Sequence, residues 1–257
     1  DSDTAQKLDQ LLGKLFKEEQ IYRIDHYLAK EMLQNILSFR FSNSLFEETW
    51  NNRFIEKIDI TTLEKLDLKD RGHFYDAIGA LRDVGQNHLL QMLALVTMDH
   101  PEALDIEPIR KERAKLLKTL ITPNQKHIKE LTFRGQHEGY HKLDNVKPRS
   151  KTETYFKVGL YLNHPRWQGV PITIVSGKVM KEIKKEIRVT FKHPSPCLCP
   201  PGSKHFKNTV TFSLEPFEGI KVQFWNKKPG FNYEIEEKNL LVELRDTKGR
   251  LQYVEEY

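Results

Sequence analysis

Apolar side chains recur with the period of an α-helix in the first half of the chain. Over residues 4–19 the apolar positions, from Leu8 to Leu15, follow a 3.6-residue spacing that predicts an amphipathic helix. Residues 21–24 have the pattern of a short strand. A second helix is expected to begin near Asp25, an acceptable N-cap, and to carry one apolar stripe as far as residue 37.

Three more elements are predicted before the middle of the chain. Residues 55–62 alternate between apolar and polar side chains, which indicates a strand. Residues 75–98 are expected to form one helix whose last half has few polar positions and is therefore buried on most sides. A further amphipathic helix is predicted over residues 105–121, ended by Pro123.

The second half changes character after a polar loop over residues 134–149. Six later segments have the composition of strands: 155–162, 172–175, 187–191, 209–214, 220–225 and 240–244. Helices do not alternate with these strands, so an antiparallel sheet is favoured over a doubly wound parallel one. The expected fold class is α+β, with helices packed on a large, mainly antiparallel sheet.

Composition narrows the function classes. The 257 residues include 41 Lys and Arg against 36 Asp and Glu, a net charge of +5, and eight of the basic residues fall between 176 and 207. This stretch predicts an anionic partner. No apolar run approaches the roughly 20 residues of a membrane span, and the first residues lack a signal-peptide pattern. A soluble, cytoplasmic protein with no membrane contact is expected.

The nucleotide motifs that depend on glycine are excluded. Of the 13 glycines, the closest two are four residues apart, so neither Gly-x-Gly-x-x-Gly nor a P-loop can exist in this sequence.

Two patterns resemble metal sites. Residues 137–141, His-Glu-Gly-Tyr-His, match the His-Glu-x-x-His pattern of zinc peptidases, which needs both imidazoles on one face of a helix. A glycine inside the motif and polar neighbours favour a solvated loop instead. Cys197-Leu198-Cys199 is followed by two prolines and a glycine, so it is interpreted as a turn with two incidental thiols. The two cysteines cannot supply a four-ligand site by themselves, and no metal site is predicted.

Ionisable groups concentrate near residue 25. If a helix begins at Asp25, His26 and Lys30 are spaced i,i+4 and Tyr27 and Lys30 are spaced i,i+3, so three donors share the first turns of that helix. A helix N-terminus also attracts anions, which gives the pattern of a phosphate site. An ordinary capped helix with exposed charges fits the spacing equally well.

A second polar cluster comes before the apolar end of the predicted helix over 75–98. On an ideal α-helix Asp83 and His88 lie about 140° apart, so they would line neighbouring walls of a cleft. A single histidine entering an apolar helix is more often a hydrogen-bonded core residue than a catalyst. Spacing alone does not choose between these interpretations.

Residues 23–31, Arg-Ile-Asp-His-Tyr-Leu-Ala-Lys-Glu, resemble the signature Arg-Ile-Asp-His-Tyr-Leu-Gly-Lys-Glu of the glucose-6-phosphate dehydrogenases. Ala29 replaces the glycine. Residues 166–171 resemble the family's Arg-Trp-x-Gly-Val-Pro, and residues 228–230 its Lys-Pro-Gly. Other matching segments, in family order, are 71–72, 74–76, 82–91 and 176–178. The resemblance runs to about residue 230 and is highly specific.

The resemblance implies a reaction in which β-D-glucose 6-phosphate is oxidised at C1 to 6-phosphoglucono-δ-lactone with hydride transfer to NADP. His88 matches the general base and Asp25 the carboxylate that orients it. The residues matching substrate contacts are His26, Tyr27 and Lys30 for the phosphate, Glu64 and Asp83 for the sugar hydroxyls, and Lys178. Ile183 and Glu215 stand where relatives often carry a basic residue and a glutamine near the substrate, and His73 replaces a usual glycine.

The resemblance also implies a division of the chain. Residues 1–35 match the end of the coenzyme-binding domain, including the substrate-phosphate motif, and residues 36–257 match the C-terminal β+α domain. The family's Gly-x-x-Gly-Asp and Glu-Lys-Pro-Phe-Gly motifs lie upstream of Asp1, and its closing helices would follow Tyr257. We therefore expect this chain alone to bind glucose 6-phosphate weakly and to be inactive. The alternative is a non-catalytic module for sugar-phosphate binding or dimerisation.

Family members pair through their sheets, so a homodimer or tetramer is expected, and no nucleic-acid partner. Lys184 and Arg188 match positions that hold a structural NADP in some relatives. A solvated basic strand is a slightly favoured explanation for these two residues.

Overall fold

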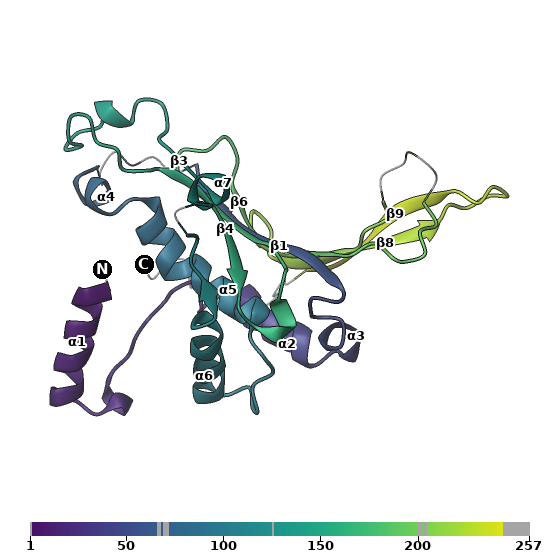
Figure 1. Ribbon diagram of the computed structural model, residues 1–257, viewed down its shortest axis with the longest axis horizontal. Helices are drawn as coiled ribbons and strands as arrows, with labels where there is room; N and C mark the ends of the chain where they lie inside the picture. The colour runs from purple at the N-terminus through teal and green to yellow at the C-terminus, as the bar shows by residue number, and fades with distance from the viewer. Residues whose placement is uncertain are drawn as a thin grey trace.

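The computed structural model describes residues 2–65, 68, 72–124, 126–199, 202 and 205–243. A long twisted sheet forms the frame of this part of the chain, and helices α2, α5 and α6 lie against one of its faces (Figure 1). Among the described residues, no helix has the length and apolar character needed to cross a bilayer.

The sheet has nine strands in the described part of the chain, in the order β2-β4-β5-β1-β6-β7-β8-β9, with β3 paired to β4. Their bounds are β1 Ile55–Leu63, β2 Leu120–Ile121, β3 Thr132–Gly135, β4 Tyr155–Leu162, β5 Ile172–Gly177, β6 Lys184–Phe191, β7 Thr209–Glu215, β8 Gly219–Lys227 and β9 Ile235–Glu243. Only the β1–β5 pair among these is parallel. The α+β class and the mainly antiparallel sheet are confirmed.

The helices come mostly from the first half. Their bounds are α1 Ser2–Leu15, α2 Glu31–Phe41, α3 Ser44–Glu47, α4 Gly72–Ile78, α5 Leu90–Thr97, α6 Ile106–Leu117 and α7 Ile128–Leu131. A π-helix, η3, spans Leu81–Leu89, and short 3₁₀ turns are η1 Glu18–Gln20, η4 Tyr140–Lys142 and η5 Pro165–Trp167.

The core lies between the sheet and the helices. Ile58 and Ile60 of β1 and Ile187 of β6 are fully buried, as are Met32 of α2 and Met92 of α5. Because strand side chains alternate, the neighbouring residues of β1 and β6 project to the opposite face of the sheet. This alternation decides which charged residues of β6 can reach the helical side.

The predictions for residues 21–30 were wrong in two respects. Residues 21–24 join no strand. The next helix begins at Glu31 rather than near Asp25, because the Asp25 carboxylate accepts the N–H of Tyr27 within a turn and Lys30 has extended backbone angles. Such a local bond offers the backbone an alternative to helix. His26 and Lys30 therefore do not share a helical face.

The segment 75–98 is not one α-helix. Helix α4 ends at Ile78, and Gly79 adopts φ +78°, a left-handed conformation that ends a helix and that glycine accommodates readily. The chain restarts as the π-helix η3, where the N–H of Leu90 donates to the carbonyl of Gly85 five residues earlier. In a π-helix residues i and i+5 lie one turn apart. Asp83 and His88 are thus stacked along the helix instead of lying 140° apart.

Two other boundaries differ from the sequence prediction. Helix α6 ends at Leu117, and the last two residues of the predicted helix pair with β4 as β2. The predicted loop over 134–149 begins with the end of β3 and contains η4. Gly139 has φ +85°, so residues 137–141 do not form the continuous helix that the zinc-peptidase pattern requires.

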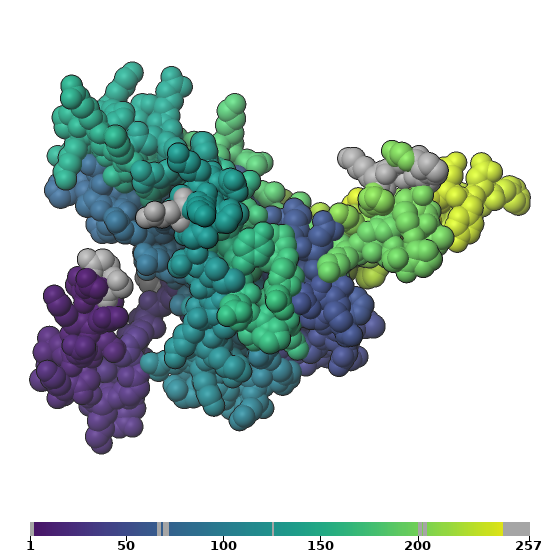
Figure 2. Space-filling view, in the orientation of Figure 1, coloured from purple at the N-terminus to yellow at the C-terminus, as the bar shows by residue number. Residues whose placement is uncertain are grey.

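Helix α1 stands at the edge of the molecule (Figure 2). More than half of Leu8, Leu11 and Leu15 is exposed, so the apolar stripe that predicts this helix contributes little to the core. Arg23, in the segment that follows α1, pairs with Asp9 of the helix at 2.6 Å, and Arg110 of α6 pairs with Glu18 just after the helix at 2.7 Å.

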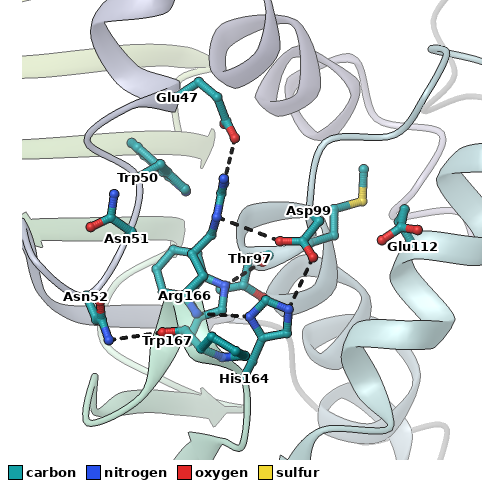
Figure 3. Close-up of polar contacts among 12 residues, drawn as sticks. Glu47, Trp50, Asn51, Asn52, Thr97, Asp99, Glu112, His164, Arg166 and Trp167 are labelled. Carbon is teal, nitrogen blue, oxygen red and sulfur yellow. Dashed lines mark hydrogen bonds and ion pairs between the residues drawn. The ribbon is translucent and has the colours of Figure 1, made fainter.

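A polar network fastens η5 to the helices (Figure 3). The guanidinium of Arg166 bonds Glu47, and the Trp167 indole N–H donates to the Thr97 carbonyl at 2.6 Å. Arg40, fully buried, donates to two carbonyls at the end of α5. Burial lowers the pKa of Arg40 to about 9, although Glu47 opposes the shift. The Arg-Trp motif therefore has a structural role.

We predict that Trp167→Phe lowers the free energy of unfolding by about 2–4 kcal/mol, because the Thr97 carbonyl loses its partner in a dry site and the smaller ring leaves a void. Urea unfolding measures this change. The control Tyr233→Phe removes a polar atom from an exposed ring and should change stability by less than about 0.5 kcal/mol. Equal effects of the two substitutions would contradict the structural role of the indole N–H.

Candidate functional site

Asp25 and His88 form the centre of the site. His88 Nδ1 lies 2.9 Å from Asp25 Oδ1, and both side chains are less than a fifth exposed. The same oxygen accepts the N–H of Tyr27, which fixes the carboxylate. Burial alone would raise the pKa of Asp25, but its bonds to His88 and Tyr27 lower it below the usual value. Asp25 is thus held as a carboxylate that orients the imidazole of His88.

Two aromatic neighbours hold the His88 ring in place. The buried ring of Tyr27 stacks on it, with centroids 4.3 Å apart and planes 11° apart, and His26 meets it edge-on at 4.6 Å. Burial raises the pKa of Tyr27 to about 12, so this phenol stays neutral. Burial and the nearby His88 lower the pKa of His26. The structure therefore brings the predicted residues 25–27 and His88 together despite the missing helical turn.

Two lysines flank Tyr27. Lys30 and Lys185 place their ammonium groups 5.9 and 5.8 Å from the Tyr27 ring centroid. Glu215, at the end of β7, lies 3.0 Å from Lys185 and 3.7 Å from Lys30. Burial alone would lower the pKa of Lys185, but its acidic neighbours raise it above the usual value. Two cations thus face one region, partly neutralised by Glu215.

Glu64 and Lys178 meet because β1 and β5 are parallel. Leu63 pairs with Gly177, so the next residue of each chain segment leaves the sheet at the same edge. Lys178 donates to Glu64, and Lys185 lies 3.2 Å from the other Glu64 oxygen. Burial alone would raise the pKa of Glu64, but the two lysines lower it. Glu64 therefore stays ionised and joins Lys178 to the cluster around Tyr27.

The charge of Asp83 acts on the buried phenol of Tyr75. Asp83 stands one π-helical turn before His88, and its negative charge adds to burial in raising the pKa of Tyr75. Glu64 acts on the same phenol, so both residues expected to contact sugar hydroxyls raise the pKa of Tyr75. Among the residues that the structure describes, the Tyr75 hydroxyl has no hydrogen-bond partner.

Lys184 and Arg188 lie on the other face of the sheet. They alternate with the buried Ile187, whereas Lys185 is on the helical side with it. Both bind one oxygen of Glu186, at 3.2 Å for Lys184 and 3.0 Å for Arg188. The structure thus separates these two residues from the substrate cluster, and it gives their positive charges a partner within the strand.

The sequence pattern missed Lys185 and Tyr75. Lys185 is one of eight basic residues in its stretch, and only its register opposite Thr62 of β1, which is fully buried, shows that it faces the helices. Tyr75 lies within a segment that resembles the family, but the resemblance implies no role for it. Tyr75 falls at an apolar position of the helical pattern, so the sequence does not distinguish it from an ordinary core residue.

Three of the central side chains could also act as ligands. One atom each from Asp25, His26 and His88 lies within 4.8 Å of the others. However, His88 Nδ1 is already committed to Asp25, which leaves Nε2 as the nitrogen free of that bond. The arrangement is that of an imidazole base oriented by a carboxylate.

Comparisons with known proteins identify the family of this chain. The family model described as glucose-6-phosphate dehydrogenase, C-terminal domain, matches residues 37–257, and its NAD binding domain matches residues 1–35. A glucose-6-phosphate 1-dehydrogenase from Borreliella burgdorferi is 43% identical over 248 residues, which cover 93% of this chain and 52% of the relative. One from Bacillus subtilis is 41% identical over 241 residues, 90% of this chain and 49% of the relative.

Solved structures give the same result. A glucose-6-phosphate dehydrogenase in complex with its substrate glucose-6-phosphate superposes with a TM-score of 0.85 at 33% identity, covering 94% of this chain and 50% of that one. The enzyme from Mycobacterium avium gives 0.84 at 30% identity, covering 94% and 53%. This chain spans about half the length of the relatives it matches. It belongs to the glucose-6-phosphate dehydrogenase family.

Proposed function

We propose that this chain carries the glucose 6-phosphate side of a dehydrogenase active site. The observation that carries the proposal is the 2.9 Å bond between His88 Nδ1 and Asp25, which leaves His88 Nε2 available as a base. The family membership and the substrate complex among the structural relatives support the choice of sugar phosphate.

The chemistry requires removal of a hydride from C1 of the sugar and of a proton from the C1 hydroxyl. His88 Nε2 takes the proton of the C1 hydroxyl as the C1–H bond breaks, and the C1=O bond of the lactone forms. Asp25 stabilises the imidazolium that results, because its carboxylate is ionised and directly bonded. NADP, when bound, supplies the hydride acceptor.

The charged groups around the base suit the rest of the substrate. Lys30, with His26 and Tyr27, is proposed to bind the phosphate, and Lys185 adds a second ammonium group beside Tyr27. The sugar hydroxyls are assigned to Glu64 and Asp83, and Lys178 orients Glu64 toward them. Charge-assisted bonds of this kind are stronger than neutral ones.

No residue of this chain is assigned to the pyrophosphate of a nucleotide. The glycine spacing excludes the fingerprints that cradle a pyrophosphate, and Lys184 and Arg188 are bound to Glu186, which would repel a phosphate. The basic strand is therefore better explained by its internal ion pairs than by a structural NADP. No step of the chemistry is assigned to these two residues.

A homodimer or tetramer that forms through the sheet stays a proposal. Its support is the end of the sheet, where Leu240, Leu241 and Val242 of β9 are each more than half exposed. Leu240 and Val242 project to one face and Leu241 to the other, and exposed apolar side chains grouped on a face are typical of an interaction surface. A cytoplasmic location is proposed from the use of cysteine, since both thiols are free.

We predict that Lys30→Ala weakens the binding of glucose 6-phosphate by about tenfold or more, since one charged contact is worth about 1.5–3 kcal/mol. Isothermal titration of the 257-residue chain measures the change. Lys7→Ala, in exposed helix α1, is the matched control and should leave affinity unchanged.

A second variant in the same titration should change the affinity for glucose 6-phosphate in the opposite direction. Glu215→Gln removes the negative charge beside Lys30 and Lys185, so the affinity for the sugar phosphate should rise. Loss of affinity in Glu215→Gln together with unchanged affinity in Lys30→Ala would refute the placement of the phosphate.

We predict that Asp25→Asn destabilises the fold by about 1–2 kcal/mol at pH 7 and by less at pH 3. The pKa of Asp25 is lower in the folded chain than in the unfolded one, so its ionised form stabilises the fold above about pH 4 and this contribution disappears as pH falls further. Urea unfolding at the two pH values measures it.

The control for that pair of measurements is Asp105→Asn, at the N-cap of α6, where asparagine caps as well as aspartate. An Asp25→Asn deficit that is the same at both pH values would show that the charge of Asp25 is not what the fold uses.

The 257-residue chain, assayed alone with glucose 6-phosphate and NADP, is predicted to form no NADPH, because its residues provide no nucleotide fingerprint. Absorbance of the reduced nicotinamide follows the reaction. Turnover above that of a His88→Asn chain would overturn this prediction. Absence of both turnover and sugar-phosphate binding would instead favour a dimerisation module.

A further inference from the structure

Four metal-binding side chains converge in the loop between β6 and β7. They are His193, Cys197, Cys199 and His205, and one ligand atom of each lies within 4.8 Å of all the others. We propose that these four residues bind one Zn²⁺ in a tetrahedral site. The site is separate from the sugar-phosphate cluster and does not depend on the proposed function.

The distances match those of a tetrahedral thiolate–imidazole centre. Zn–S bonds of about 2.3 Å and Zn–N bonds of about 2.0–2.1 Å at tetrahedral angles separate a sulfur and a nitrogen ligand by about 3.6 Å. His193 Nε2 lies 3.1 Å from Cys199 Sγ, and Cys197 Sγ lies 3.8 Å from His205 Nδ1. Shifts of about half an ångström would therefore bring these atoms to bonding positions.

The backbone already supports the two sulfurs. The N–H of Cys199 points to Cys197 Sγ at 3.4 Å, and the N–H of Phe206 points to Cys199 Sγ at 3.3 Å. Hydrogen bonds of this kind stabilise and orient metal-bound thiolates. Neither cysteine is in a disulfide, so both sulfurs are available as ligands.

Both ends of the loop are fixed to the sheet. On the β6 side the N–H of Lys192 donates to the Phe54 carbonyl at 2.6 Å. On the β7 side Phe206 packs against Trp225 of β8, whose indole N–H donates to the Lys207 carbonyl at 3.0 Å. The ligands thus begin two residues after one strand and end four residues before the next. A metal here would close the loop across its base.

The ligand set selects the kind of metal and its role. Two thiolates and two imidazoles suit Zn²⁺, whereas Mg²⁺ and Ca²⁺ prefer oxygen ligands. Four protein ligands leave no position for a water or a substrate, which is typical of a structural site. The loop lies at the end of the sheet where the β8–β9 hairpin extends, on the side away from α1 (Figures 1 and 2). Zinc would therefore stabilise the loop and not take part in catalysis.

Titration with Co²⁺ tests the proposal. The reduced, metal-free 257-residue chain is titrated under argon, and one Co²⁺ per chain should bind with the intense visible bands and thiolate charge-transfer band of a tetrahedral site. Addition of Zn²⁺ should displace the cobalt and abolish the bands. Binding of less than one equivalent, or the weak spectrum of an octahedral ion, would overturn the proposal.

Variants locate the site. Cys197→Ser with Cys199→Ser, and separately His193→Gln with His205→Gln, should each weaken binding by more than about 100-fold, beyond the cost of losing a supporting hydrogen bond. His137→Gln with His141→Gln is the matched control, because it removes the other histidine motif, and it should leave binding unchanged. Retained binding in both ligand-pair variants, or loss only in the control, would contradict the assignment.

The zinc proposal and the sugar-phosphate proposal can be tested independently of each other. The chain that carries both His193→Gln and His205→Gln should bind glucose 6-phosphate as the unmodified chain does, since these residues are absent from the sugar-phosphate cluster. Circular dichroism of each variant checks that the sheet is retained.

Discussion

The hydrogen bond between Asp25 and His88 is the contact on which the site depends. It joins residues that are 63 positions apart in the chain, one in the turn before α2 and one near the end of the π-helix. The bond requires a carboxylate held by the N–H of Tyr27 and an imidazole held by the Tyr27 ring. One short segment thus fixes the base from two directions, and the rest of the cluster is arranged around it.

The π-helix gives this arrangement its geometry. Gly79 ends α4 in a left-handed conformation, which lets the chain restart with a wider turn. The wider turn aligns Asp83 with His88, whereas an α-helix would direct them to different walls. π-Helical segments are rare, and they occur frequently at functional sites.

Lysine and glutamate side chains form ion pairs with one another across the site before any ligand binds. Lys178 and Lys185 share Glu64, and Lys185 and Lys30 share Glu215. The parallel β1–β5 pair brings the first of these contacts to one edge of the sheet. A phosphate would have to compete with Glu215 for the two cations. This competition explains why a substitution at position 215 changes the expected affinity while leaving the base intact.

The sequence predicted the sheet well because alternation and β-branched composition are local signals. Every strand predicted from residue 155 onward is present, although residue 244 of the last one lies outside the described residues. Predictions failed where a local side-chain bond or an unusual turn overrides periodicity, as at Asp25 and Gly79. The family resemblance identified most residues of the site, but their spacing in the sequence did not show how they lie in space. Lys185 was missed, because only the strand register shows that it faces the helices.

The cysteine-containing turn shows the same limit. Cys197-Leu198-Cys199 is followed by two prolines and a glycine, and two cysteines alone cannot supply four ligands, so the pattern indicated incidental thiols. The two histidines lie four residues before Cys197 and six after Cys199. Only the fold of the β6–β7 loop brings all four together.

A crystal structure of this chain with glucose 6-phosphate tests the central claim most directly. The proposal predicts the C1 hydroxyl oxygen within about 2.6–3.2 Å of His88 Nε2, with Asp25 still bonded to Nδ1 and the phosphate beside Lys30. A sugar bound with C1 beyond reach of His88, or a phosphate bound away from Lys30, would contradict it.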